Sequence, residues 1–376
     1  MTLDALAGER QFIDHLAPIW HALPDHVRGS FIVEPHLVDH AHALGIQPVA
    51  QERPLRVPAY PPPRFDGPLA LVASYGDVKV GRRLGYGPFA FIEHGCGQTY
   101  NGDPRRQPRS GSYAGGGDRE DNELILVPNQ HSADAWRAAY PSAMVEIVGS
   151  PRLEALPKRE PDRDFGECEH GPVGQCTAPY TDGVMPCSRF EFTRTVALSF
   201  HWDASSVSPE AGTALGEYLP ILGELAKAEQ YRIIGHAHPK GDWPRVCERY
   251  FRRAGIEFEP DFAEVCRRAD LYVCDNSSTL FEFASTGRPV VVLNSKHYRK
   301  SIHHGLRFWA TADVGMQVDD PGQLIATIDH ALADPPEQQA ARERALDVVY
   351  SHRSGGAQRA AQAIVAWLGQ RAEQAA

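Results

Sequence analysis

The stretch LYVCDNSSTLFEFASTGRPVVVLN, residues Leu271–Asn294, decides the fold of this chain. Its first apolar run, Leu271–Cys274, predicts a buried strand, and its last, Val290–Leu293, predicts a second one. Between them lie a polar elbow, a short helical segment and the helix break Gly287-Arg288-Pro289. Two apolar strands joined by one short helix are typical of a βαβ unit in a parallel sheet.

The polar elbow Asp275-Asn276-Ser277-Ser278 falls where the first strand ends and the helix begins. At such a point free backbone N–H groups and the helix dipole favour an anion, and two hydroxyls add further donors. Ligands of open α/β sheets bind at this edge. The alternative is that Ser277 or Ser278 only caps the helix.

The rest of the chain repeats the alternation of strands and helices. Apolar strands are predicted at 69–74, 89–93, 124–127, 144–148, 196–200, 231–234 and 256–259. A long amphipathic helix is predicted over Pro209–Ala228, and a last helix over Gln358–Leu368 places Ala360, Ile364 and Leu368 on one stripe. A chain of 376 residues exceeds one typical core. We therefore expect two α/β domains with parallel sheets.

Composition narrows the function classes. The net charge of −10 argues against generic nucleic-acid binding, which needs a basic face. No apolar run approaches the roughly 20 residues of a membrane span. The first residues, MTLDALAGERQF, show neither a basic region nor an apolar core of the kind found in signal peptides, so we expect a cytoplasmic protein.

Four polar elbows follow predicted strands, and their order carries a resemblance. They are EHG (93–95), GSPR (149–152), HAHP (236–239) and DNSSTLFE (275–282), the last followed by RPVVVLN. This ordered set resembles the CDP-glycerol glycerophosphotransferase family over about Phe89–Asp334. The resemblance implies the GT-B fold of nucleotide-sugar glycosyltransferases, in which two Rossmann-like domains with parallel sheets face a central cleft.

The resemblance also implies roles for single residues. His94 would be the base that deprotonates an acceptor hydroxyl, because a histidine titrates near neutrality. His238, followed by Pro239, would contact the donor diphosphate, whereas His236 is expected to be structural. The remaining donor-binding residues are Asp275, Ser277, Ser278 and Glu282, where Glu282 stands in place of the family's usual aspartate.

Three further features leave alternatives open. Arg152 is either a hinge residue or a phosphate contact. The basic residues Lys296, Arg299 and Lys300, where the family has an acidic segment, form either a weak acceptor or phosphate site or a solvated loop. The Cys/His cluster is either a structural zinc site or a set of free thiols, which we favour; it consists of Cys168, His170, Cys176 and Cys187.

These features combine into one hypothesis about organisation. We expect an acceptor-side α/β domain over 1–156, a hinge and insertion with the Cys/His cluster over 157–194, a donor-binding α/β domain over 195–350 and a C-terminal helix over 351–376. The Asp162-Arg163-Asp164 triplet matches the Asp-x-Asp of metal-dependent glycosyltransferases, but it lies away from any strand end. We therefore expect catalysis without a required cofactor or divalent ion.

The predicted function is transfer of a glycosyl or polyol-phosphate group from a CDP-, UDP- or GDP-linked donor to an acceptor hydroxyl. The first alternative is a UDP-N-acetylglucosamine 2-epimerase-like enzyme, which would need additional cleft carboxylates; Asp77 and Glu93 lie at strand ends but form no motif. The second is a non-catalytic nucleotide-binding scaffold of the same fold. The resemblance is also compatible with peripheral membrane attachment. The sequence does not identify the acceptor.

Overall fold

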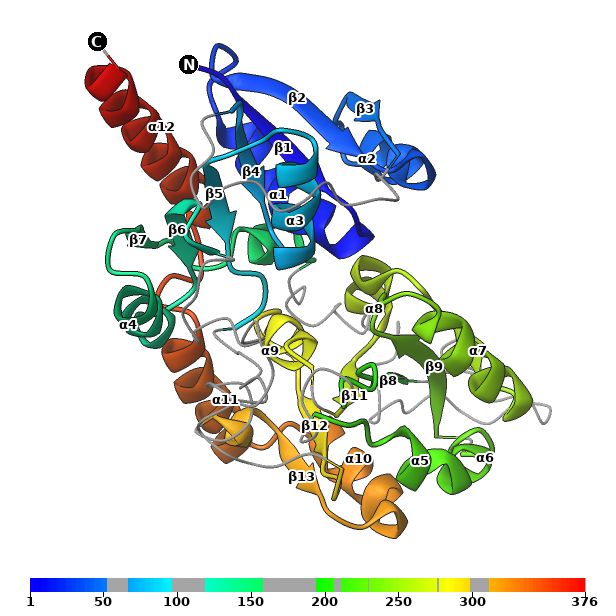
Figure 1. Ribbon diagram of the computed structural model, residues 1–376. Coiled ribbons are helices and arrows are strands. Elements are labelled where there is room, and N and C mark those ends of the chain that lie inside the picture. Colours follow the sequence, from blue (N-terminus) through cyan, green and yellow to red (C-terminus); the bar gives the residue numbers. More distant parts are fainter. Residues whose placement is uncertain are drawn as a thin grey trace, which may run out of the picture.

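The computed structural model places two parallel sheets one above the other, each covered by helices (Figure 1). It describes residues 1–52, 67–96, 119–157, 194–205, 211–228, 230–275, 277–297 and 311–375. The predicted pair of α/β domains is confirmed. The Cys/His cluster and the Asp162–Asp164 triplet lie outside the described residues.

The N-terminal sheet has seven parallel strands in the order β3-β2-β1-β4-β5-β6-β7. All four residues of β4 and of β5 are buried, because helices cover both faces of a parallel sheet. The strands are β1 (Leu3–Ala7), β2 (Arg28–Val33), β3 (Pro48–Ala50), β4 (Leu69–Val72), β5 (Phe89–Ile92), β6 (Asn122–Val127) and β7 (Met144–Ile147).

Helices and turns of this half connect the strands. They are α1 (Arg10–Ala22), η1 (Pro35–Leu37), α2 (Val38–Ala43), α3 (Tyr75–Arg83), α4 (Gln130–Ala139) and η3 (Pro151–Ala155). Helix α3 was not predicted from the sequence. Its start is fixed by Ser74, whose side chain accepts a hydrogen bond from the Asp77 N–H at 3.0 Å.

The C-terminal sheet has six parallel strands in the order β10-β9-β8-β11-β12-β13. They are β8 (Arg194–Phe200), β9 (Tyr231–Ala237), β10 (Glu257–Phe258), β11 (Leu271–Cys274), β12 (Val290–Leu293) and β13 (Met316–Val318). Strand β11 continues through α9 (Thr279–Ala284) into β12, and the two strands pair in parallel. The predicted βαβ unit is thus confirmed.

The helix predicted over Pro209–Ala228 is wrong in its described part. Residues 215–225 instead form three short turns, because Pro220 lacks the N–H that a continuous helix needs. They are α5 (Leu215–Tyr218), η4 (Leu219–Ile221) and α6 (Leu222–Leu225). The other helical elements are α7 (Trp243–Arg253), α8 (Phe262–Arg268), η6 (Ala312–Val314), η7 (Pro321–Gln323), α10 (Leu324–Leu332) and α11 (Pro336–Val349).

The last helix, α12 (Gly356–Ala375), crosses back to the N-terminal sheet and packs on α1 (Figure 1). Its predicted stripe of Ala360, Ile364 and Leu368 is buried in the same core cluster as residues of α1, β1 and β4. The two halves are therefore connected twice, once before β8 and once between α11 and α12. Among the described residues, no helix has the length and apolar content needed to cross a membrane.

The segment between α11 and α12 explains why the GSPR elbow (149–152) contains Gly149. Gly149 has φ of +80°, and a Cβ there would lie 2.2 Å from the backbone oxygen of His352. We expect Gly149→Ala to lower the free energy of unfolding by about 1–3 kcal/mol, measured by urea denaturation. Gly255→Ala is the matched control, because Gly255 also has φ of +80° but open space around its Cβ. Equal losses in both variants would show that the contact with His352 contributes nothing.

Candidate active site

His94 follows β5 at the carboxyl edge of the N-terminal sheet. Its ring Nδ1 lies 2.6 Å from the Ala73 carbonyl oxygen, and because a carbonyl only accepts, Nδ1 carries the proton. The other ring nitrogen, Nε2, then keeps its lone pair. Gly95 next to it has φ of +98°, a conformation that favours glycine and explains the His-Gly pair.

The surroundings of His94 keep its imidazole neutral. Burial lowers the pKa of His94 below its ordinary value of 6.5, and the charges of Lys240 and Arg152 act in the same direction. The Ala73 hydrogen bond and the Glu9 carboxylate oppose this shift without cancelling it. A neutral imidazole with a free lone pair can accept a proton at physiological pH.

Asp275 organises the carboxyl edge of the C-terminal sheet. Its fully buried carboxylate accepts hydrogen bonds from the His201 N–H at 2.6 Å, the Ala214 N–H at 2.9 Å and the Thr213 hydroxyl at 3.1 Å. It thereby links the loops that follow β8 and β11. Asp275 was predicted among the donor-binding residues, and its contacts give it a positioning role for these loops.

His238 and His201 lie side by side at this edge. Their ring centroids are 4.8 Å apart with the rings at 66°. His238 is half-buried, followed by half-buried Pro239, whereas His201 is buried. The sequence reasoning did not single out His201; its signal is that His201 follows β8 immediately, as the other elbow residues follow their strands.

The surroundings of His236 fit the structural role that was predicted for it. It is buried, and its Nδ1 donates to the Glu259 carbonyl oxygen at 2.8 Å. Burial lowers its pKa to about 4. His236 is therefore a neutral residue within the domain.

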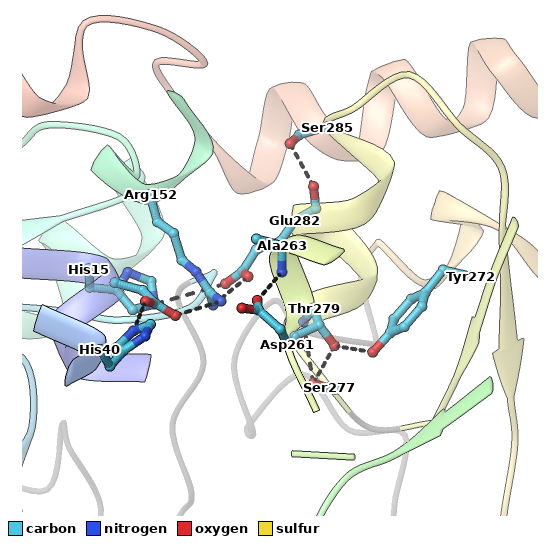
Figure 2. A network of polar contacts seen from close by, with 11 residues as sticks. His15, His40, Arg152, Asp261, Ala263, Tyr272, Ser277, Thr279, Glu282 and Ser285 are labelled. Carbon is cyan, nitrogen blue, oxygen red and sulfur yellow. Dashed lines mark hydrogen bonds and ion pairs between the residues drawn. The ribbon is translucent and has the colours of Figure 1, made fainter. Parts of the chain in front are cut away.

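The two serines of the elbow differ in their contacts. Ser277 is buried and its hydroxyl lies 2.7 Å from the Thr279 hydroxyl, which in turn lies 2.9 Å from the Tyr272 hydroxyl (Figure 2). Ser278 is half-buried at the start of α9, and its side chain makes no capping hydrogen bond. Their predicted phosphate contacts remain predictions, and Ser278 is the more accessible of the two.

Arg152 bridges the two domains. Its guanidinium donates to Glu282 of α9 at 2.8 Å (Figure 2) and to Asp14 of α1 at 3.3 Å. The Arg152 and Glu282 side chains are only 9% and 2% exposed. This position fits the hinge role among the two considered for Arg152. The donor-binding role of Glu282 stays a prediction, because this carboxylate already pairs with Arg152.

The same interface contains residues that the sequence reasoning missed. Asp14 also accepts a hydrogen bond from His40 at 2.7 Å. His15 lies next to His94, with ring centroids 6.0 Å apart, and its Nε2 is 4.0 Å from Glu282. Burial, followed by the charge of Arg152, lowers the pKa of His15 well below 6.5. Asp14 and His15 lie on α1, where the sequence shows them as ordinary polar residues of an amphipathic segment.

The remaining predicted site residues are either exposed or outside the described residues. Lys296 is exposed, and Arg299, Lys300 and the four proposed zinc ligands Cys168, His170, Cys176 and Cys187 lie outside the described residues. Within the described ranges, no group of three or more His, Cys, Asp or Glu side chains is arranged to hold a metal ion. The zinc and basic-cluster interpretations therefore remain predictions.

The carboxylates considered for an epimerase are engaged elsewhere. Glu93 is buried and accepts a hydrogen bond from the Trp136 indole at 3.2 Å. Asp77 is buried in the first turn of α3. Both carboxylates are therefore buried, with Glu93 8% and Asp77 2% exposed.

A comparison with protein families finds a match in the C-terminal half of the chain. Residues 224–366 match the family model described as CDP-Glycerol:Poly(glycerophosphate) glycerophosphotransferase. The matched segment begins in α6, covers most of the C-terminal domain and ends within α12. The matched segment contains His238, Asp275, Ser277, Ser278 and Glu282, whereas His94 and Arg152 precede it. No curated protein matches the chain by sequence.

Solved structures show the same fold across both domains. The wall teichoic acid polymerase TagF is 12% identical with a TM-score of 0.57, covering 99% of this chain and 89% of its own. UDP-GlcNAc 2-epimerase from Neisseria meningitidis, bound to UDP-GlcNAc, is 14% identical with a TM-score of 0.59, covering 98% and 100%. MnaA from S. aureus, bound to UDP, is 14% identical with a TM-score of 0.58, covering 97% and 95%.

Together the family match and the fold confirm the predicted resemblance, the GT-B-like architecture and the transferase class. The structural likeness alone shows only the fold, because transferases and epimerases have similar scores. The glycerophosphotransferase match over residues 224–366 favours the transferase class over the epimerase class.

Proposed function

We propose that this protein transfers a polyol-phosphate group, or a glycosyl group, from a nucleotide-diphosphate donor to an acceptor hydroxyl. One observation carries the proposal: Lys240, two residues beyond His238 on the C-terminal domain, pairs with Glu9 at the start of α1. Phe12 of the same helix contacts the His94 ring, with the ring centroids 5.0 Å apart. The turn that carries His238 thus lies against the helix that contacts the proposed base. Such a placement suits an enzyme that holds donor and acceptor on different domains.

In the proposed reaction, His94 Nε2 removes the proton of the acceptor hydroxyl as its oxygen attacks the donor. For polyol-phosphate transfer, the new O–P bond forms at the terminal phosphorus and the bond to the inner phosphate breaks, so a nucleoside monophosphate leaves. For glycosyl transfer, the new O–C bond forms at the anomeric carbon and a nucleoside diphosphate leaves. His238 and the start of α9 would stabilise the charge that develops on the leaving phosphate.

The two group transfers are distinguished by the nucleotide that is released. We expect incubation with CDP-glycerol and an oligo(glycerol phosphate) acceptor to release CMP, quantified by anion-exchange chromatography. Release of CDP or UDP from nucleotide sugars, with no CMP from CDP-glycerol, would replace polyol-phosphate transfer by glycosyl transfer. Conversion of UDP-N-acetylglucosamine into its 2-epimer, with no group transfer, would contradict the transferase proposal. Tight nucleotide binding without any product would favour a scaffold.

The pKa of His94 predicts the pH dependence of the reaction. Because burial lowers this pKa below 6.5, the base remains neutral at pH 6.5 and is protonated only in more acidic solution. We therefore expect kcat/KM to be insensitive to pH near neutrality and to fall only below about pH 6.5. The measurement is kcat/KM between about pH 5 and pH 9 in buffers of constant ionic strength. An acidic limb centred clearly above 6.5 would contradict the assignment of His94 as the base.

A further inference from the structure

Lys240 lies in the turn after β9, two residues beyond His238, and its ammonium pairs across the domain interface with the carboxylate of Glu9. The turn is compact, because the Lys240 N–H donates to the His238 carbonyl oxygen at 2.8 Å. The Lys240 and Glu9 side chains are 44% and 20% exposed. Both are thus accessible at the surface of the interface.

Both charges of this pair act on His94. The Glu9 carboxylate raises the pKa of His94 and the Lys240 ammonium lowers it, although burial dominates. Phe12, three residues after Glu9, contacts the His94 ring with the ring centroids 5.0 Å apart, so the pair lies near the proposed base. Lys240 is two residues beyond His238, at the edge where the donor phosphates are expected. Glu9 is the residue just before α1, and its carboxylate also accepts a hydrogen bond from the Gln11 side-chain amide.

We infer that Lys240 is a donor-phosphate ligand and that Glu9 is an internal anion which competes with the donor for it. This inference rests on the proposed function and assigns two residues that neither the motifs nor the family resemblance singled out. A lysine ammonium beside His238 supplies the positive charge that a diphosphate needs. In the structure the Glu9 carboxylate pairs with this ammonium, and an arriving diphosphate must displace the carboxylate.

The exposure of the pair makes this exchange feasible. Ion pairs between partly exposed side chains contribute little stability, so a dianionic ligand can replace Glu9 at small cost. A diphosphate brings more charge than one carboxylate and also reaches His238. Since Glu9 is on the N-terminal domain and Lys240 on the C-terminal domain, the exchange also releases one contact between the domains.

The test measures pyrophosphate and CDP dissociation constants by isothermal titration calorimetry at fixed, low ionic strength. We expect Glu9→Gln to tighten binding by about 1.5- to 5-fold, the range of a partly exposed ion pair. We expect Lys240→Gln to weaken binding by about tenfold, because it removes a charge-assisted contact. In the double variant, Glu9→Gln should no longer change the affinity, since its competitor role needs Lys240.

Asp261→Asn is the matched control. Asp261 forms another partly exposed pair between the domains, with Arg10 at 2.5 Å, and asparagine can still accept the Ala263 N–H that Asp261 caps. We expect Asp261→Asn to leave both dissociation constants unchanged. An equal tightening in Asp261→Asn and Glu9→Gln would show that loosening the interface, and not competition at Lys240, raises affinity, and it would overturn the inference.

The other outcomes separate this inference from the proposed function. Wild-type protein that binds CDP, with Glu9→Gln unchanged or weaker, would refute the competition while leaving the transferase proposal intact. Folded wild-type protein that binds neither CDP nor pyrophosphate would contradict the donor site itself, and with it the inference.

Discussion

Replacing His94 with asparagine is expected to lower kcat by about 10²- to 10⁴-fold, the contribution of a positioned general base. Asparagine fills a similar space and can still donate to the Ala73 carbonyl oxygen through its amide, but it cannot accept a proton at neutral pH. Because His94 acts on the acceptor hydroxyl, the donor dissociation constant should change by less than about twofold. The assay is CMP release from CDP-glycerol, with calorimetry for the donor affinity.

His36→Asn is the matched control for this variant. His36 is an exposed residue of η1 in the same domain, and its ring Nδ1 lies 3.5 Å from the Glu34 carboxylate. We expect its kcat to equal that of the wild type. A His94→Asn enzyme that keeps more than about a tenth of wild-type kcat would exclude His94 as the base.

Replacing Arg152 with methionine is expected to have the largest effect on stability. Methionine keeps the apolar stem of the side chain but leaves the Glu282 and Asp14 carboxylates without their common partner. Removing one member of a buried ion pair costs about 3–5 kcal/mol, because the remaining charge stays buried and uncompensated. The measurement is urea denaturation followed by circular dichroism and by tryptophan fluorescence.

Two further variants define the cause of this loss. Arg152→Met/Glu282→Gln should recover part of the lost stability, because it removes the buried charge that the single variant leaves behind. Arg267→Met is the control, because Arg267 pairs with Glu264 on the surface and its loss should cost less than about 1 kcal/mol. A loss in Arg152→Met no greater than in Arg267→Met would show that the bridge does not stabilise the interface.

The sheets could be predicted because the apolar strands and the polar elbows that follow them are both local patterns in the sequence. Strands such as β4, β5, β11 and β12 are continuous apolar runs, since they are buried on both faces. The elbows after them are short polar clusters, which the parallel topology brings to one edge of each sheet. The helix over 209–228 was predicted wrongly, because its apolar residues have helical spacing although Pro220 prevents a continuous helix.

The interface could not be predicted, because its partners are far apart in the chain. Arg152 meets Glu282 and Asp14 across 130 and 138 residues, and neither pairing has a local pattern. His15 and His201 were missed for the same reason: each is an ordinary polar residue until folding places it beside His94 or His238. The motif residues were identified through the family resemblance, and their roles remain to be tested.

The C-terminal helix shows what a local sequence pattern can and cannot predict. The stripe of Ala360, Ile364 and Leu368 predicted a helix with one buried face, and this is confirmed. The packing of this helix on α1 and the N-terminal sheet could not be predicted, because the helix follows the C-terminal domain in the chain (Figure 1). Which surface covers an amphipathic helix depends on the topology of the whole chain.

The most direct test of the central claim is a thermal-shift titration of the purified protein with CDP, UDP, GDP and CDP-glycerol. A ligand that binds only the native state raises the Tm in proportion to the logarithm of its concentration. We predict a concentration-dependent rise with one nucleotide, lost in a His238→Ala/Ser278→Ala variant whose own Tm without ligand shows that it is folded. The absence of any rise in folded wild-type protein, or a rise that the double variant keeps in full, would contradict the donor site at the carboxyl edge of the C-terminal sheet.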